Sequence, residues 1–65
     1  MDERLRIGQR IKEIRTEKGI TQRQLAEMTG LKQHHISRVE KGTYNTGINI
    51  LANVATALGK RIDFI

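Results

Sequence analysis

Four polar side chains in the middle of the chain stand at spacings that place them on one side of a helix. Gln33 lies four residues before Ser37, and His34 lies four residues before Arg38. A carboxamide can form two hydrogen bonds to adenine, and a guanidinium can form two to guanine. Histidine and serine can each donate or accept a bond. On a helix lying in a DNA major groove these side chains would read bases; the alternative is an ordinary solvated helix face.

The segment over residues 21–42 predicts two short helices joined by a tight turn. Ala26 is small enough for a second helix to cross close to the first. Gly30 can adopt a positive φ, which ends one helix and redirects the chain. The apolar side chains that the two helices would share are Leu25, Ile36 and Val39. This arrangement is typical of a helix-turn-helix, whose second helix presents its N-terminal residues to the major groove.

Apolar periodicity predicts one further helix on each side of this pair. Isoleucines recur at i, i+4 and i+7 in the first of them, namely Ile7, Ile11 and Ile14. The last helix has an apolar stripe of Ile48, Leu51, Val54, Ala55 and Leu58. Thr21 and Gln24 fit a capping box, and Thr46 is the expected N-cap of the last helix. We therefore expect one all-α domain over residues 1–65, with helices over about 5–18, 22–28, 32–40 and 47–58.

Two strings in this segment, TQRQLAEMTGL and KQHHISRVEKG, resemble the Cro/C1-type (XRE family) repressor domains of phages and bacteria. The resemblance extends upstream to IGQRIKEIRTEKGITQ and downstream to INILANVATALG, so it covers about residues 7–59. It implies a small lambda-repressor-like bundle that binds double-stranded DNA. In the repressors that it resembles, the positions matching Gln33, His34 and Arg38 read base edges. Ser37 shares their face and is the fourth candidate.

The resemblance also implies contacts to the DNA backbone and one structural ion pair. Gln22 begins the second helix, where backbone N–H groups favour anions. The other candidates for phosphate contacts are Lys32, His35, Thr43, Tyr44 and Asn45. Tyr44 has the alternative of capping the core. The family pairs a basic residue late in the first helix with the acidic residue that ends the third, which implies that Arg15 pairs with Glu40.

Residues 60–65 alternate between polar and apolar side chains, a period that predicts a short β-strand. The same strand of a second copy could satisfy its unpaired N–H and C=O groups, with Ile62 and Phe64 as dimerisation residues. Some antitoxins of this superfamily have such a strand, and this tail resembles theirs. The alternatives are a frayed tail and one that folds back with Phe64 as a plug. We expect a homodimeric repressor on a palindromic operator, with a DNA-binding antitoxin that also binds a protein toxin as the alternative.

Composition favours DNA over other partners. Twelve Lys and Arg against seven Asp and Glu give a net charge of +5, which attracts phosphate backbones. One tyrosine and one phenylalanine are too few for the stacking platforms of single-strand and RNA binders. A helix-turn-helix fold that only binds proteins is a further alternative.

Other function classes lack the residues that they need. Cysteine is absent, and His34 and His35 point about 100° apart on a helix, so we expect no metal and no cofactor. The motifs for a phosphate loop or an activated nucleophile are missing, so we expect no enzyme. A second domain has no room, so we expect no small-molecule effector. The charged N-terminus and the lack of a long apolar run predict a cytoplasmic protein without membrane contact.

Overall fold

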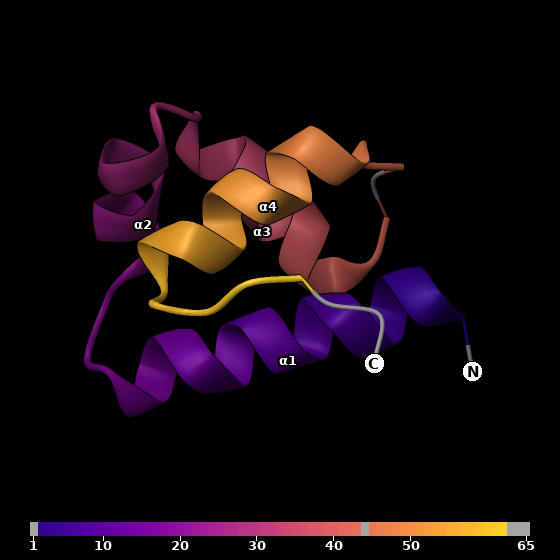
Figure 1. The fold of residues 1–65 in the computed structure, drawn as a ribbon, viewed down its shortest axis with the longest axis horizontal. Coiled ribbons are helices and arrows are strands. Elements are labelled where there is room, and N and C mark those ends of the chain that lie inside the picture. Colours follow the sequence, from indigo (N-terminus) through magenta and orange to yellow (C-terminus); the bar gives the residue numbers. More distant parts are fainter. Residues whose placement is uncertain (1, 44, 63–65) are drawn as a thin grey trace.

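The computed structural model describes residues 2–43 and 45–62 of the chain. In this part the chain forms four helices: α1 (Glu3–Glu17), α2 (Gln22–Thr29), α3 (Gln33–Lys41) and α4 (Ile48–Ala57). The helices α2, α3 and α4 lie together on one side of α1, with α3 packed against α1 and α2 (Figure 1). The predicted all-α helix-turn-helix bundle is therefore confirmed. None of these helices is long and apolar enough to cross a membrane.

Side-chain caps decide where the first two helices begin. α2 has the predicted capping box: Thr21 Oγ1 accepts from the Gln24 N–H at 3.0 Å, and Gln24 Oε1 accepts from the Thr21 N–H at 2.8 Å. α1 begins two residues earlier than predicted because Asp2 Oδ1 accepts from the Arg4 N–H at 2.8 Å. The predicted cap at Thr46 is wrong, since Gly47 is the N-cap of α4 and no side chain caps that helix.

Two glycines end α2 and α3, as the sequence predicts. Gly30 and Gly42 have φ values of +74° and +72°, in the left-handed region that glycine adopts at low cost. Gly42 also allows a close approach, because a Cβ there would lie 2.6 Å from Leu5 Cα. The start of α1 is therefore packed directly against the end of α3.

The core lies where the four helices meet. Its fully buried side chains are Leu25, Ile36, Val54 and Leu58, and Ile11, Ala26 and Val39 are also buried. The predicted apolar wedge between α2 and α3 is thus present. Thr29 stands just before the turn, where its hydroxyl donates to the carbonyl of Leu25 at 2.9 Å. The hydroxyl thereby finds a partner inside its own helix, which explains how a polar residue is accommodated there.

The predicted strand over residues 60–65 is not seen in its described part, residues 60–62. The backbone N–H of Lys60 instead donates to the carbonyl of Ala55 at 2.8 Å, and that of Gly59 donates to Thr56 at 3.0 Å. These two bonds end α4 in a Schellman motif. The N–H groups of residues 59 and 60 are therefore used inside the helix end and are not available to a strand. The segment then runs between α4 and α1 (Figure 1), where Ile62 lies beside apolar residues of both helices. Phe64 lies outside the described residues.

Candidate nucleic-acid interface

The four predicted base-reading residues lie on one surface. Together with two neighbours they line a shallow depression, which we call the α2–α3 hollow: Gln22, Gln33, His34, Ser37, Arg38 and Lys41. Gln33, His34 and Arg38 are exposed, and Ser37 is half-buried. The sequence indicated only diffuse charge and no specific contact for Lys41, although its spacing of three from Arg38 already placed it on this face.

α3 presents this surface because its opposite face is held in the core. Ile36, Val39 and Glu40 are its buried residues, so the side chains on the other side of the helix face outward. None of the six residues lining the hollow is acidic, and two of them, Arg38 and Lys41, are basic. The hollow can therefore accept an anion, while its amide, hydroxyl and imidazole groups can exchange hydrogen bonds with a polar ligand.

Arg15 and Glu40 form a buried ion pair beneath this surface. Arg15 Nε donates to Glu40 Oε2 at 2.6 Å, and Nη2 donates to Oε1 at 3.1 Å. Arg15 Nη1 also donates to the carbonyl of Ile20 at 2.9 Å, in the segment that leads into α2. Arg15 and Glu40 are 8% and 5% exposed. The pair joins α1 to α3 and neutralises the one acidic side chain on the buried face of α3.

Gln22 connects this ion pair to the hollow. Its Nε2 donates to Glu40 Oε1 at 3.0 Å, and the side chain is half-buried. The sequence placed Gln22 at the phosphate backbone and carried no signal for this bond, because the two residues lie on different helices. Gln22 therefore has one face on a buried carboxylate and another on the hollow.

None of the other predicted phosphate-contacting residues that the structure describes lines the hollow. Lys32, Thr43 and Asn45 are exposed, and His35 is half-buried. Lys32 is the N-cap of α3 and makes no side-chain capping bond. Thr43 Oγ1 donates to the carbonyl of Arg38 at 3.3 Å. Tyr44 lies outside the described residues.

Two residues that position α3 and its turn were missed in the sequence. A Cβ on Gly8 would collide with the carbonyl oxygens of Val39 and Glu40, so α1 and α3 cross with almost no space between their backbones. Asn53 of α4 donates to the carbonyl of Thr29 at 2.8 Å and holds the end of α2. A glycine inside a helical pattern was the available signal for Gly8; Asn53 offered none.

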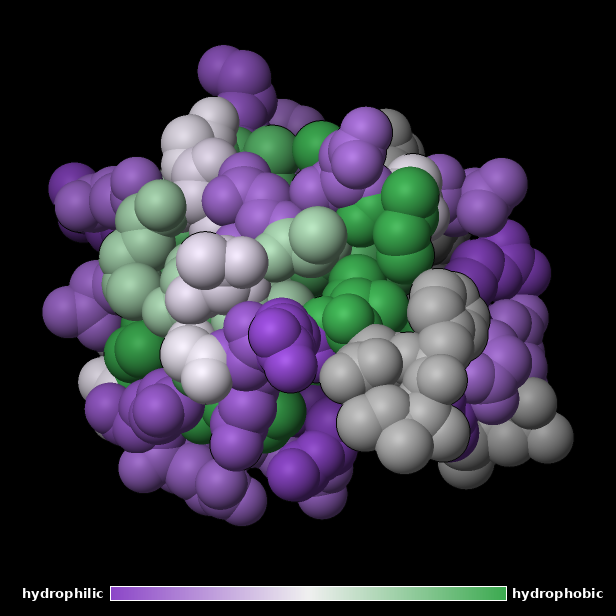
Figure 2. Space-filling model, in the orientation of Figure 1, coloured by the Kyte–Doolittle hydropathy of each residue, from purple (hydrophilic) through white to green (hydrophobic). Residues whose placement is uncertain are grey.

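An apolar groove lies between α1 and α4, apart from the hollow. We call it the α1–α4 groove; it is lined by Ile7, Ile11, Ile48, Leu51, Ala55 and Ile62, with Glu3 and Arg6 beside them. Ile48 and Ile62 are 58% and 39% exposed. Figure 2 shows hydrophobic surface on the face formed by α4 and α1. Ile48 thus belongs to the predicted stripe of α4 without entering the core.

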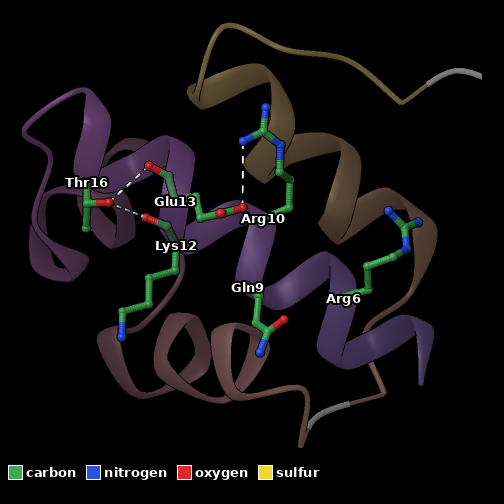
Figure 3. Close-up of a pocket in the computed structure, with 6 residues that line it drawn as sticks. All are labelled: Arg6, Gln9, Arg10, Lys12, Glu13 and Thr16. Carbon is green, nitrogen blue, oxygen red and sulfur yellow. Dashed lines mark hydrogen bonds and ion pairs between the residues drawn. The ribbon is translucent and has the colours of Figure 1, made fainter. Parts of the chain in front are cut away.

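A third depression is polar and lies on α1 alone (Figure 3). Arg10 Nη1 lies 3.7 Å from Glu13 Oε1, and Arg6 Nη2 lies 2.7 Å from Glu3 Oε2. Gln9 also lines it. These arginines are balanced by carboxylates, unlike the cations of the α2–α3 hollow.

Comparison with known proteins agrees with this architecture. Residues 11–65 match the helix-turn-helix family. The immunity repressor protein of Bacillus phage phi105 is 42% identical over 59 residues, which are 91% of this chain and 41% of that protein. The chain spans less than half the length of the first two curated relatives it matches, 41% and 29%.

Two solved structures have the same fold over nearly the whole chain. The restriction-modification controller protein C.AhdI from Aeromonas hydrophila superposes with a TM-score of 0.87 at 36% identity, covering 91% of this chain and 89% of that one. The clp gene regulator ClgR from C. glutamicum gives a TM-score of 0.87 at 32% identity, covering 91% and 76%. The chain therefore belongs to the helix-turn-helix family of transcriptional regulators.

Proposed function

We propose that this protein is a sequence-specific repressor that places α3 in the major groove of double-stranded DNA. The observation that carries the proposal is the α2–α3 hollow, which gathers Gln33, His34 and Arg38 on one cationic surface without an acidic residue. The similar proteins support it, since one is named an immunity repressor, one a restriction-modification controller protein and one a gene regulator.

Within this proposal the residues of the hollow read bases, and the residues outside it contact the DNA backbone. Gln33 pairs with adenine and Arg38 with guanine, because each offers two hydrogen-bonding groups in the required geometry. His34 and Ser37 add single bonds. Lys32, Thr43 and Asn45 are exposed close to α3 and contact phosphates. The logarithm of the affinity then falls linearly with the logarithm of the salt concentration, because neutralised phosphates release their counterions.

The active form in this proposal is a homodimer on a palindromic operator. A second copy covers the α1–α4 groove, whose Ile48 and Ile62 would otherwise remain in water. A core this small rarely supplies more than about 3–5 kcal/mol, so burial between copies adds needed stability. Two recognition helices would then enter successive major grooves about 34 Å apart. Bound at a promoter, the dimer blocks polymerase.

The same groove is the surface on which a protein toxin would dock if the chain were a DNA-binding antitoxin. Sedimentation of the chain with and without Ile48→Glu distinguishes the two occupants. A dimer that this substitution disrupts supports a second copy in the groove, whereas a chain whose association it leaves unchanged keeps the groove open for a different protein.

The experiment that tests the proposal is selection of bound duplexes from a random library, followed by titrations with Gln33→Ala and Arg38→Ala. Each variant should lose about 1–3 kcal/mol and relax only its own base positions. Gln9→Ala and Arg10→Ala are matched controls, because they remove the same side chains from the depression on α1. Absence of any selected sequence, or equal losses in the controls, would refute base reading by α3.

A further inference from the structure

Glu40 restricts the orientation of the Gln22 side chain. An ionised carboxylate only accepts hydrogen bonds, and Gln22 Nε2 lies 3.0 Å from Glu40 Oε1. The reversed amide would set its carbonyl oxygen against a carboxylate oxygen, leaving two acceptors without a proton between them. Only the NH₂ end of Gln22 can therefore face Glu40, and the carbonyl oxygen is directed away from it.

Glu40 cannot turn to accommodate a different amide. Both of its oxygens accept from Arg15, at 2.6 Å and 3.1 Å, and the residue is 5% exposed. Arg15 is held in turn by the carbonyl of Ile20 at 2.9 Å. The orientation of Gln22 is thus imposed from beneath the surface by a network of three parts: Arg15 on α1, the carbonyl of Ile20 just before α2, and Glu40 on α3.

The outer side of Gln22 belongs to the α2–α3 hollow, which it lines together with Gln33 and Arg38. What it presents there is a carbonyl acceptor and one remaining N–H. DNA phosphates carry no donors, so that carbonyl can pair with a donor on a base edge or on a neighbouring side chain, directly or through a water molecule, but not with a phosphate itself. An amide free to rotate would offer a donor or an acceptor equally well.

We propose that Glu40 is a positioning residue for DNA recognition, which acts through Gln22 to hold a hydrogen-bond acceptor at the edge of the α2–α3 hollow. The inference rests on the proposed function, since it concerns how that hollow reads DNA. It makes base preference depend on a buried residue that touches no DNA. It also limits any phosphate contact of Gln22 to its second N–H.

The orientation is measured first in the free protein by NMR. The Nε2 protons of Gln22 should show nuclear Overhauser contacts to the side chain of Glu40 and exchange with water more slowly than those of Gln9. Gln9 is the matched control because it carries the same amide on the exposed face of α1. Missing contacts, with exchange as fast as that of Gln9, would overturn the inference without any DNA.

The consequence for recognition is measured by selecting bound duplexes with the wild type and three variants. Gln22→Met removes both ends of the amide, Gln22→Lys keeps a donor to Glu40 without an acceptor, and Glu40→Gln lets the amide reverse. All three should lose roughly 5- to 100-fold of discrimination at the same base positions. The positions relaxed by Arg38→Ala should keep their preference, which distinguishes lost positioning from general destabilisation.

The outcomes separate this inference from the proposed function. A wild type that selects no sequence refutes both. A wild type that selects a sequence, with Gln22→Met or Gln22→Lys selecting the same one, refutes only the positioning role. If Glu40→Gln does not fold, the two Gln22 variants and the NMR contacts of the wild type still test the positioning role, because the Arg15–Glu40 ion pair is intact in all of these proteins.

Discussion

Gly8 of α1 lies directly against the carbonyl oxygen of Val39 in α3, with no room for a Cβ between them. This contact sets the distance between the first helix and the helix that lines the hollow. Alanine would favour an isolated helix over glycine by about 1 kcal/mol. The clash reverses that preference, because backbone atoms cannot move aside as a flexible side chain can.

Gly8→Ala should therefore lower the free energy of unfolding by about 1–3 kcal/mol, the usual cost of overpacking. Urea melts followed by circular dichroism measure this change. Gln9→Ala is the control, since it alters the next residue on the exposed face of α1 and should leave the midpoint nearly unchanged. A Gly8→Ala protein as stable as the wild type would show that α1 and α3 are not in contact there.

The Arg15–Glu40 pair should contribute far more to stability than a surface pair. Glu40→Gln leaves Arg15 buried at 8% exposure without its anion and should cost about 3–5 kcal/mol. Arg23 and Glu27 are the control pair, 3.4 Å apart with side chains 81% and 69% exposed. Glu27→Gln should cost about 0.5 kcal/mol or less. Equal shifts of the two urea midpoints would contradict a buried lock between α1 and α3.

The α1–α4 groove predicts a specific effect on self-association. Ile48→Glu should weaken the proposed dimer by roughly tenfold or more, because each copy would bury one unpaired carboxylate against apolar surface. Analytical ultracentrifugation over a range of concentrations measures the dissociation constant. Met28→Glu is the control, since Met28 is 53% exposed against 58% for Ile48 but lies on α2, outside the groove. A dimer weakened equally by both substitutions would place the contact elsewhere.

The N-terminal cap should respond to acid. The pKa of Asp2 lies below its ordinary value of 3.8, chiefly because its carboxylate accepts a side-chain hydrogen bond from Arg4 and also one from the Arg4 backbone N–H. A lowered folded-state pKa means that the ionised cap stabilises the fold above the unfolded pKa. This stability is lost as the pH falls through the folded value.

Arg4→Gln should therefore raise the pKa of Asp2 toward 3.8, without restoring it fully because the backbone bond remains. An NMR titration of the Asp2 side-chain carboxyl measures the shift. The pKa of Glu3 should stay below its ordinary value in this variant, because its lowering comes chiefly from a side-chain hydrogen bond to Arg6. Equal upward shifts of both groups would contradict the separate pairings.

The sequence predicted most of the elements that depend on neighbouring residues, although the cap at Thr46 and the strand over residues 60–65 were wrong in the described part of the chain. It gave no signal for the bond between Gln22 and Glu40. Gly30, Gly42 and the Thr21 capping box act within one turn of chain, so their types and spacing were sufficient. The strand over residues 60–65 was predicted from alternation and from the resemblance of the tail to that of antitoxins. The N–H groups of Gly59 and Lys60 are instead bonded to carbonyls of α4, and residues 60–62 form no strand. Gln22 and Glu40 are 18 residues apart, and only the packing of α2 on α3 reveals that they are bonded.

The buried and the exposed residues of α3 are different sets, which has a consequence for how such proteins diverge. Ile36, Val39 and Glu40 hold the helix, whereas Gln33, His34 and Arg38 are exposed and bury nothing in the core. Substitutions at the exposed positions can accumulate at little thermodynamic cost, since surface changes are usually within about 0.5 kcal/mol. Under the proposed function, a duplicated gene could thus acquire a new operator in a few steps while its product stayed folded, and a designer could graft a foreign set of exposed residues onto the same helix.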